Sequence, residues 1–210
     1  AQDRVTSSAG APTVGLGVLE RLDACPGVYD LGALRTIVIG GAGAPEALVR
    51  GLEERHGFRV LTSWGMTEIA PVGTLGTLTP EGEALPPSER HALRMKAGVP
   101  GALLELRVRN ELGDVPWDGV TMGELELRGA YAASAYYRPE DGGGDCFTGD
   151  GWFRTGDIAT IDARGYLEIR DRTKDLVKSG GEWISSVALE GVLMSHPAVL
   201  EAAVLAVPHP

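Results

Sequence analysis

Cysteine and histidine are scarce in this sequence of 210 residues. Its two cysteines, Cys25 and Cys146, lie far apart and outside any Cys-x-x-Cys pair, so the pattern argues against a disulfide framework and favours a cytosolic protein with free thiols. The four histidines are scattered and lack the spacing of a metal-ligand pair. No zinc site is therefore predicted.

Long hydrophobic runs and concentrated positive charge are also lacking. No stretch of about 18 apolar residues occurs, so we expect no membrane span, and the first residues do not have the pattern of a signal peptide. The net charge is -10 and no run of Lys or Arg occurs, which argues against a nucleic-acid partner. A nucleotide can still bind, because backbone amides at helix starts hold a phosphate even in an acidic protein.

The composition is otherwise typical of a globular protein, with 43% hydrophobic and 23% charged residues. Glycine is abundant, at 30 residues without a collagen period, which indicates tight turns and places where backbone lies close to a ligand. The first residue is not Met, and the last segment stops just after an apolar run, so both ends look like cut ends. We expect a soluble, cytoplasmic protein, of which this chain is an internal piece.

Residues 1–97 have the pattern of an α/β domain. Apolar residues repeat at helical spacing over 13–22, and a short apolar run over 36–39 is typical of a buried strand. A glycine turn, a helix over 45–56 and a strand over 58–61 follow. This βαβ-like order predicts a parallel sheet whose ligand-binding edge carries both strand ends.

Beyond a polar, proline-rich stretch the period changes to two, over residues 98–171. Leu125 and Leu127, for example, alternate with Glu124 and Glu126, which predicts half-buried antiparallel strands in a small barrel-like β subdomain. A charged, glycine-bearing hinge or hairpin is expected next. A helix over 186–195 and a strand over 199–206 would then begin a further domain.

The glycine turn itself, Gly40-Gly41-Ala42-Gly43, is an imperfect dinucleotide fingerprint. A third glycine is absent where Glu46 stands, and the next strand does not end in an acidic residue that could hold a ribose. A tight turn between strand and helix, without any ligand, is a better interpretation of these glycines than a dinucleotide site.

The segment Ser63-Trp64-Gly65-Met66-Thr67-Glu68 combines a flat aromatic, a glycine, a hydroxyl and a carboxylate. Trp64 can stack on adenine, Gly65 lets backbone approach phosphates, Thr67 can donate to a phosphate oxygen, and Glu68 is an oxygen ligand suited to Mg²⁺. Taken alone, the same residues are equally compatible with a loop that has a core Trp and a helix-capping Thr.

Four segments together decide between these alternatives. Ser63 to Glu68 resembles the aromatic-Gly-x-Thr-Glu motif of the adenylate-forming (AMP-binding) superfamily, and Gly123 to Tyr137 is similar to its Gly-Glu and Arg-Gly segment. Gly151 to Asp157 resembles the family's Gly-Trp-x-x-Thr-Gly-Asp, and Asp171 to Asp175 with Lys178 to Ile184 resembles its hinge and following loop. The residues in these segments are most similar to those of medium- and long-chain fatty acyl-CoA synthetases, although Trp64 stands where Tyr is more common in the family.

The resemblance implies an α/β fold: part of a parallel α/β layer, a small barrel-like subdomain, a hinge at 172–175, and over 176–210 the start of an α+β C-terminal domain. It implies that Asp157 accepts hydrogen bonds from the ribose hydroxyls and that Arg172 lies near the ribose. It assigns the hinge to Lys174. The other implied positions are Gly41, Ala42, Gly65 and Met66 for ATP or AMP, Thr67 and Glu68 for catalysis, Glu68 for Mg²⁺, and Lys178, Ser179, Gly180 and Gly181 for the side facing coenzyme A.

The implied reaction uses ATP, Mg²⁺ and coenzyme A. A fatty carboxylate would attack the α-phosphate of ATP, and the coenzyme A thiol would then displace AMP. An aryl-acid or amino-acid adenylating enzyme and a non-catalytic nucleotide-binding module are the alternatives, and a homodimer is possible. The family's phosphate-loop lysine and adenylating lysine have no counterpart in the sequence. We therefore predict that this chain alone does not form an acyl-adenylate.

Overall fold

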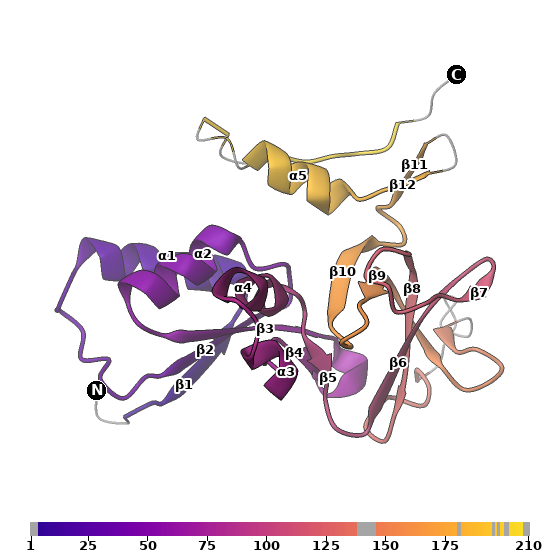
Figure 1. The fold of residues 1–210 in the computed structure, drawn as a ribbon, viewed down its shortest axis with the longest axis horizontal. Helices are drawn as coiled ribbons and strands as arrows, with labels where there is room; N and C mark the ends of the chain where they lie inside the picture. Colours follow the sequence, from indigo (N-terminus) through magenta and orange to yellow (C-terminus); the bar gives the residue numbers. More distant parts are fainter. Residues whose placement is uncertain are drawn as a thin grey trace. The chain divides into compact units, whose positions relative to one another are not determined.

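The computed structural model describes residues 4–137, 146–179, 182–194, 196, 198–199 and 202–207. The chain divides into two compact units, of which the first holds residues 1–103 with 165–167 and the second 104–164 with 168–210 (Figure 1). The first unit contains the α/β layer and the second a β-sheet followed by the C-terminal segment. The domain boundaries expected from the sequence stay predictions.

The first unit is built on a sheet with the strand order β1-β2-β3-β4-β5. Strands β1, β2 and β3 are parallel, as the sequence predicts, whereas β4 and β5 are added antiparallel. The elements are β1 (Ser7–Gly10), α1 (Pro12–Ala24), β2 (Thr36–Gly40), α2 (Glu46–Arg50), the π-helix η1 (Gly51–Arg55), β3 (Arg59–Gly65), the 3-10 helix η2 (Thr67–Ile69), β4 (Val72–Leu75), α3 (Pro80–Glu83), α4 (Pro87–Met95) and β5 (Val99–Pro100).

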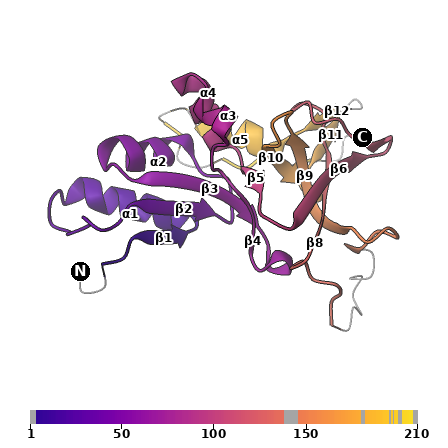
Figure 2. The ribbon, with the colours of Figure 1, turned by 60° about the horizontal axis from the view of Figure 1, so that its bottom comes forward.

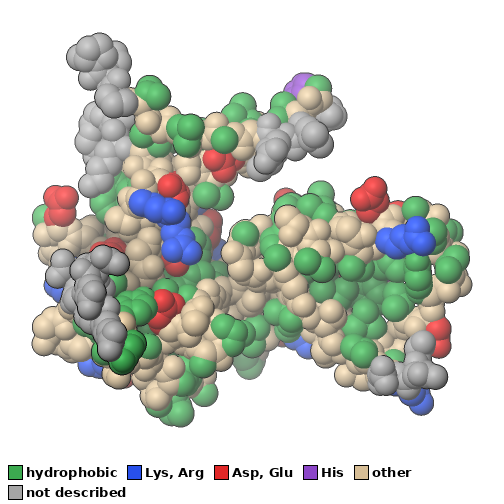
Figure 3. All heavy atoms as spheres, turned by 180° about the vertical axis from the view of Figure 1, so that it is seen from behind, with side chains coloured by type: hydrophobic (Ala, Val, Ile, Leu, Met, Phe, Trp, Pro, Cys, Tyr) green, Lys and Arg blue, Asp and Glu red, His purple; other side chains and the backbone are tan. Residues whose placement is uncertain are grey.

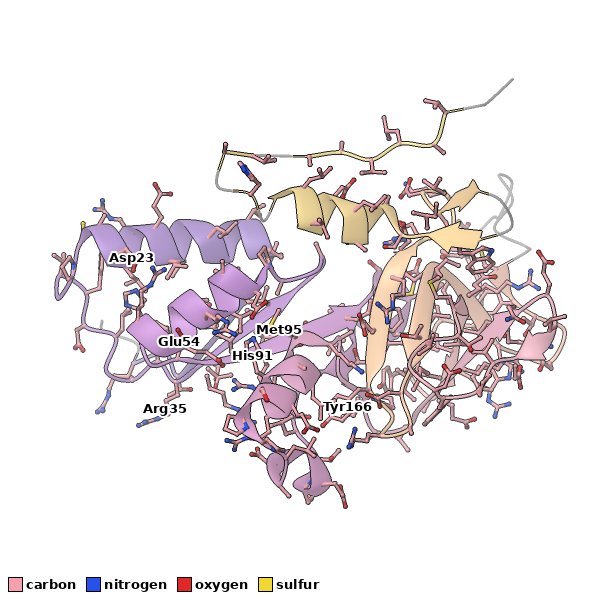
Figure 4. All side chains as sticks on the ribbon, turned by 45° about the horizontal axis from the view of Figure 1, so that its top comes forward. Asp23, Arg35, Glu54, His91, Met95 and Tyr166 are labelled. Carbon is pink, nitrogen blue, oxygen red and sulfur yellow. The ribbon has the colours of Figure 1, made fainter. Side chains whose placement is uncertain are left out.

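Helices α1 and α2 cover one face of the parallel strands (Figure 2). Alternate residues of β2 and β3 point to that face, and they form a buried core with the helices: Leu19, Ile37, Ile39, Leu48, Val49, Leu52, Phe58 and Val60. Met95 of α4 packs against this core as well (Figure 4). Strand β3 runs four residues further than the predicted 58–61, because Thr62 and Ser63 continue the pairing with β2, and Ser63 to Gly65 pair with β4.

A tyrosine holds the turn 165–167 in the first unit. Tyr166 is fully buried, and its hydroxyl donates to the Thr77 carbonyl oxygen (3.2 Å) and accepts from the Thr79 N–H (2.9 Å). Leu167 adds a backbone bond to the Gly98 carbonyl oxygen (2.8 Å). The stick view labels Tyr166 at this turn (Figure 4). Residues almost 90 positions apart in sequence are joined in this way.

The second unit is built on a sheet with the strand order β10-β9-β8-β6-β7. The pairs β6–β7, β6–β8 and β8–β9 are antiparallel, and the predicted alternation places Leu106, Leu125 and Leu127 in its core. The elements are β6 (Leu104–Asn110), β7 (Gly113–Asp114), β8 (Gly123–Gly129), β9 (Phe153–Ile161), β10 (Leu167–Arg172), β11 (Val177–Ser179), β12 (Glu182–Ile184) and α5 (Ser186–Met194).

One residue of β8 departs from the predicted alternation of buried and exposed side chains. Glu126, expected to be exposed, is only 3% exposed. Its carboxylate accepts from Arg107 Nε at 2.6 Å and lies 3.7 Å from Arg154 Nε. Trp152 lies over the same face, with the guanidinium carbons of Arg107 and Arg128 at 4.3 and 4.6 Å from the centre of its ring. A paired charge can be buried where an aromatic ring covers it.

The C-terminal segment contains the predicted hairpin, β11 with β12, and the predicted helix, α5. The predicted strand over 199–206 is wrong, since the described residues of this range are in no strand. A strand needs a neighbouring strand for its backbone bonds, and here the Val204 N–H donates to Glu190 Oε1 of α5 instead (2.9 Å). No helix in the described part of the chain is long and apolar enough to cross a membrane.

Candidate functional site

A cavity of about 450 Å³ opens at the carboxyl ends of β1, β2 and β3. Residues Val38, Gly40 and Ser63 line it, and they alternate with the core residues of their strands, so they belong to the face that α1 and α2 leave uncovered. Seen from behind, hydrophobic side chains gather over the surface of this unit, in the right half of the picture (Figure 3). The carboxyl edge of parallel strands is where such folds bind ligands.

Two adjacent glycines form the floor of the cavity for different reasons. A Cβ at Gly40 would come within 2.2 Å of Ser63 Oγ, so this glycine lets β2 and β3 end close together. Gly41 has a φ of +88° and no atom within 4 Å of the position that a Cβ would take. The backbone conformation therefore requires Gly41, and a larger side chain there would extend into the cavity.

Trp64 belongs to both the core and the cavity. It is 9% exposed, lines the cavity, and packs against Gly73 of β4, where a Cβ would approach Trp64 Cζ3 to 2.8 Å. The register of β3 against β4 shifts between Trp64 and Gly65. The two interpretations that the sequence left open, a core Trp and a ligand platform, are thus compatible with each other.

The segment after Trp64 turns sharply, and its glycine is needed by the chain itself. A Cβ at Gly65 would lie 1.9 Å from the Pro71 carbonyl oxygen. Met66 and Thr67 line the cavity next to it. Thr67 is the first residue of η2, and Met66, not Thr67, occupies the cap position. The sequence explained Gly65 by a phosphate alone, whereas the fold gives it a structural reason too.

Glu68 is partly exposed and, like Ala42, is not among the cavity-lining residues within the described part of the chain. The described residues contain no group of three or more His, Cys, Asp or Glu side chains that could hold a metal ion. Glu68 fits Mg²⁺ as a single protein ligand, because this ion commonly binds one or two carboxylates together with phosphates and water.

The second unit holds a separate charged pair, formed by Asp157 in the middle of β9 and Arg172 at the end of β10. Asp157 is 4% exposed, and its Oδ1 accepts from Arg172 Nε at 2.9 Å, while the Arg172 side chain is 59% exposed. The family resemblance of the sequence implied that both residues lie near a ribose. A buried carboxylate beside an accessible guanidinium can accept from hydroxyl groups and face an anion.

The predicted hinge follows directly. Lys174 is exposed in a turn that the Arg172 carbonyl oxygen closes by accepting from Asp175 N–H (3.0 Å), and Thr173 N–H donates to the Gly156 carbonyl oxygen (2.8 Å). Lys178 and Ser179 lie in β11. Gly180 and Gly181 lie outside the described residues.

Sequence reasoning missed Asp171, which is 2% exposed just before the hinge. Its carboxylate accepts from the Ser186 N–H (2.6 Å), the Ser186 hydroxyl (2.9 Å) and the Arg172 N–H (2.8 Å). The strand before the hinge is thereby bonded to the first residue of α5. Only its place beside Arg172 in the fourth segment could have drawn attention to Asp171.

Five predicted positions thus line one cavity of the first unit: Gly41, Trp64, Gly65, Met66 and Thr67. Asp157 and Arg172 form an ion pair within the second unit. That these two groups act on one ligand stays a prediction.

The sequence of this chain is similar to a known enzyme family and to several known proteins. Residues 1–137 match the AMP-binding enzyme family. A long-chain-fatty-acid–CoA ligase of Thermus thermophilus is 46% identical over 207 residues, covering 98% of this chain and 38% of the ligase. A 3-methylmercaptopropionyl-CoA ligase of Ruegeria lacuscaerulensis is 42% identical with the same coverage of 98% and 38%.

A solved structure is also similar, that of o-succinylbenzoate CoA synthetase from Bacillus subtilis. Its complex with an acyl-adenylate intermediate has a TM-score of 0.80 and 31% identity, over 100% of this chain and 40% of the synthetase. Its complex with ATP and a magnesium ion has a TM-score of 0.75 and 33% identity, over 96% and 39%. The mixed α/β fold expected from the sequence is confirmed, and the chain spans about 40% of the length of these proteins.

Proposed function

The chain belongs to the AMP-binding enzyme family, and on this premise we propose that it is part of a CoA ligase whose acid substrate is a fatty acid. In the proposed reaction a carboxylate oxygen attacks the α-phosphorus of ATP, and the bond to pyrophosphate breaks. The sulfur of coenzyme A then attacks the acyl carbon of the adenylate, and AMP leaves. The observation that carries the proposal is the cavity at the parallel strand ends, lined by Gly41, Trp64 and Thr67.

The proposed roles follow from the chemistry of each side chain. Trp64 offers a ring at the cavity wall on which adenine can stack, and Thr67 a hydroxyl that can donate to a phosphate oxygen. Asp157 would accept from the ribose hydroxyls while the ion pair with Arg172 orients its carboxylate. Mg²⁺, held in part by Glu68, would neutralise charge on the phosphates.

Two further roles concern the second step of the reaction. Lys174, exposed in its turn, would be the position about which the C-terminal segment swings between the two half-reactions. Lys178 and Ser179 of β11 would then approach the thiol substrate, together with Gly180 and Gly181, which lie outside the described residues. A cytoplasmic enzyme that forms homodimers completes the proposal, and sedimentation of the purified chain measures its oligomeric state.

AMP binding, measured by calorimetry on the 210-residue chain, tests the nucleotide site. We expect Asp157→Ala to weaken AMP about 10-fold or more, since a hydrogen bond to a charged group contributes about 1.5–3 kcal/mol. We expect Gly41→Val to weaken it similarly by filling the cavity. Gly57→Val is the matched control, because Gly57 has a φ of +71°, equally open surroundings and no place in this cavity. Unchanged affinity in both site variants would refute the proposed site.

The acid class is tested by competition against AMP with non-hydrolysable adenylate analogues that carry a fatty, an aryl or an amino-acid acyl group. A specificity for fatty acids predicts that the analogue with the fatty acyl group competes best. The 46% identity of this chain to a long-chain-fatty-acid–CoA ligase supports this expectation. The aryl or amino-acid analogue competing best would instead favour the alternative substrate class. Pyrophosphate exchange should be absent for this chain alone, because it lacks both family lysines.

A further inference from the structure

The Thr-Gly-Asp sequence at residues 155–157 forms a bulge in β9. In the register of β8 against β9, Glu124 lies opposite Ile158 and Glu126 opposite Arg154. Three residues of β9 therefore lie opposite a single residue of β8, Leu125. Such bulges interrupt the ladder of backbone hydrogen bonds and turn a side chain in a new direction, and they are frequent beside active sites.

One hydroxyl group bridges the interrupted ladder. Thr155 Oγ donates to the Leu125 carbonyl oxygen at 2.8 Å and accepts from the Asp157 N–H at 3.1 Å. Thr155 is 6% exposed, so water cannot readily replace these bonds. Gly156 between the two bonded residues has a φ of +71°, which a glycine adopts without strain.

The bridge ends on the carboxylate that the proposed function requires. Asp157 is 4% exposed, and its backbone N–H is the group that Thr155 holds. The Gly156 N–H is held in turn by a hydrogen bond to Glu124, a further residue of the same bulge region. The backbone at Gly156 and Asp157 is thus held to β8 by side-chain bonds and not by regular strand pairing.

We propose that Thr155 is a positioning residue, whose hydroxyl fixes the bulge so that Asp157 points its carboxylate at the ribose of the nucleotide. The inference rests on the proposed function. It requires a side chain that donates and accepts at once. Serine meets this requirement, whereas valine has the same shape as threonine but neither donates nor accepts.

The test compares AMP affinity of four forms of the full 210-residue chain by calorimetry: unchanged, Thr155→Val, Thr155→Ser and Thr160→Val. Thr160 is the matched control, because it lies in the same strand and is 1% exposed, and because among the described residues its hydroxyl has one contact, a long hydrogen bond from Arg170 Nε (3.4 Å). We expect Thr155→Val to weaken AMP about 10-fold or more and Thr155→Ser to stay within about threefold of the unchanged chain. Thr160→Val should bind AMP normally.

A second readout is amide hydrogen exchange at Asp157 without nucleotide. Exchange should accelerate in Thr155→Val and stay slow in Thr155→Ser and Thr160→Val. Normal affinity and normal exchange in Thr155→Val would overturn the inference, as would equal losses in Thr155→Val and Thr160→Val. If the unchanged chain did not bind AMP, the proposed function itself would fail, and this outcome is distinguishable because it does not depend on any variant.

Discussion

Arg107→Ala is a substitution for which the structure predicts a large loss of stability in the second unit. Arg107 pairs with Glu126, whose side chain is only 4% exposed. Without the arginine, the nearest cation to this carboxylate is Arg154 at 3.7 Å, and the carboxylate stays out of water. Removing one partner of a buried ion pair costs about 3–5 kcal/mol, and the lost stacking on Trp152 adds to it.

The reasoning makes a second prediction that separates charge from packing. The cost of Arg107→Ala arises mainly from the charge left behind, so adding Glu126→Leu should recover most of it, because apolar replacement of a buried pair is often neutral. Glu126→Leu alone should be destabilising, since it leaves the guanidinium without its closest partner. A positive coupling in this double-mutant cycle is therefore expected.

Native-state hydrogen exchange measures the effect unit by unit. Amides of β8 report the free energy of opening in the second unit, and amides of β2 report the first unit as an internal control. We expect Arg107→Ala to lower the free energy of opening at β8 amides and to leave it unchanged at β2 amides. A cost below about 1 kcal/mol for Arg107→Ala, or no recovery on adding Glu126→Leu, would show that the carboxylate is adequately solvated or paired without the arginine.

Two further substitutions and a pH titration test other parts of the fold. Tyr166→Phe leaves two backbone groups of residues 77–79 without their partner and should destabilise the first unit by about 1–3 kcal/mol, measured by exchange at β2 amides. Gly65→Ala would place a Cβ 1.9 Å from the Pro71 carbonyl oxygen and should cost about 3 kcal/mol in the same assay; normal stability would mean that the turn relaxes freely. A hydrogen bond from the guanidinium of Arg107 holds the pKa of Asp150 well below its ordinary value of 3.8. The stabilisation is thus present above that pH and lost as pH falls below it, so the difference in Tm between the unchanged chain and Asp150→Asn should shrink below about pH 4.

Local features of the sequence were sufficient for much of the first unit. The helical spacing over 13–22, the apolar run over 36–39 and the glycines after it each depend on neighbouring residues only, so their structure follows from side-chain period and backbone freedom. The predicted parallel arrangement of β2 and β3 is confirmed for the same reason, since a short helical crossover between two strands makes them parallel.

Partners that are distant in sequence decided the rest. Glu126 looks like a solvent-facing residue in its own strand, yet it is buried and paired with Arg107, whose guanidinium in turn stacks on Trp152. The apolar run over 199–206 has the composition of a strand, yet its described residues pair with no other strand, and composition alone does not supply one.

The candidate site divides in the same way. The side chains of Trp64, Thr67 and Asp157 are chemically capable of binding a nucleotide, but the sequence favoured this interpretation only through the resemblance of four segments to a known family. Which of them line a common cavity, and that Thr155 bonds both Leu125 and Asp157, depends on strand register and a bulge. Register is set by pairing across the sheet, so only the tertiary structure could show how these groups are held.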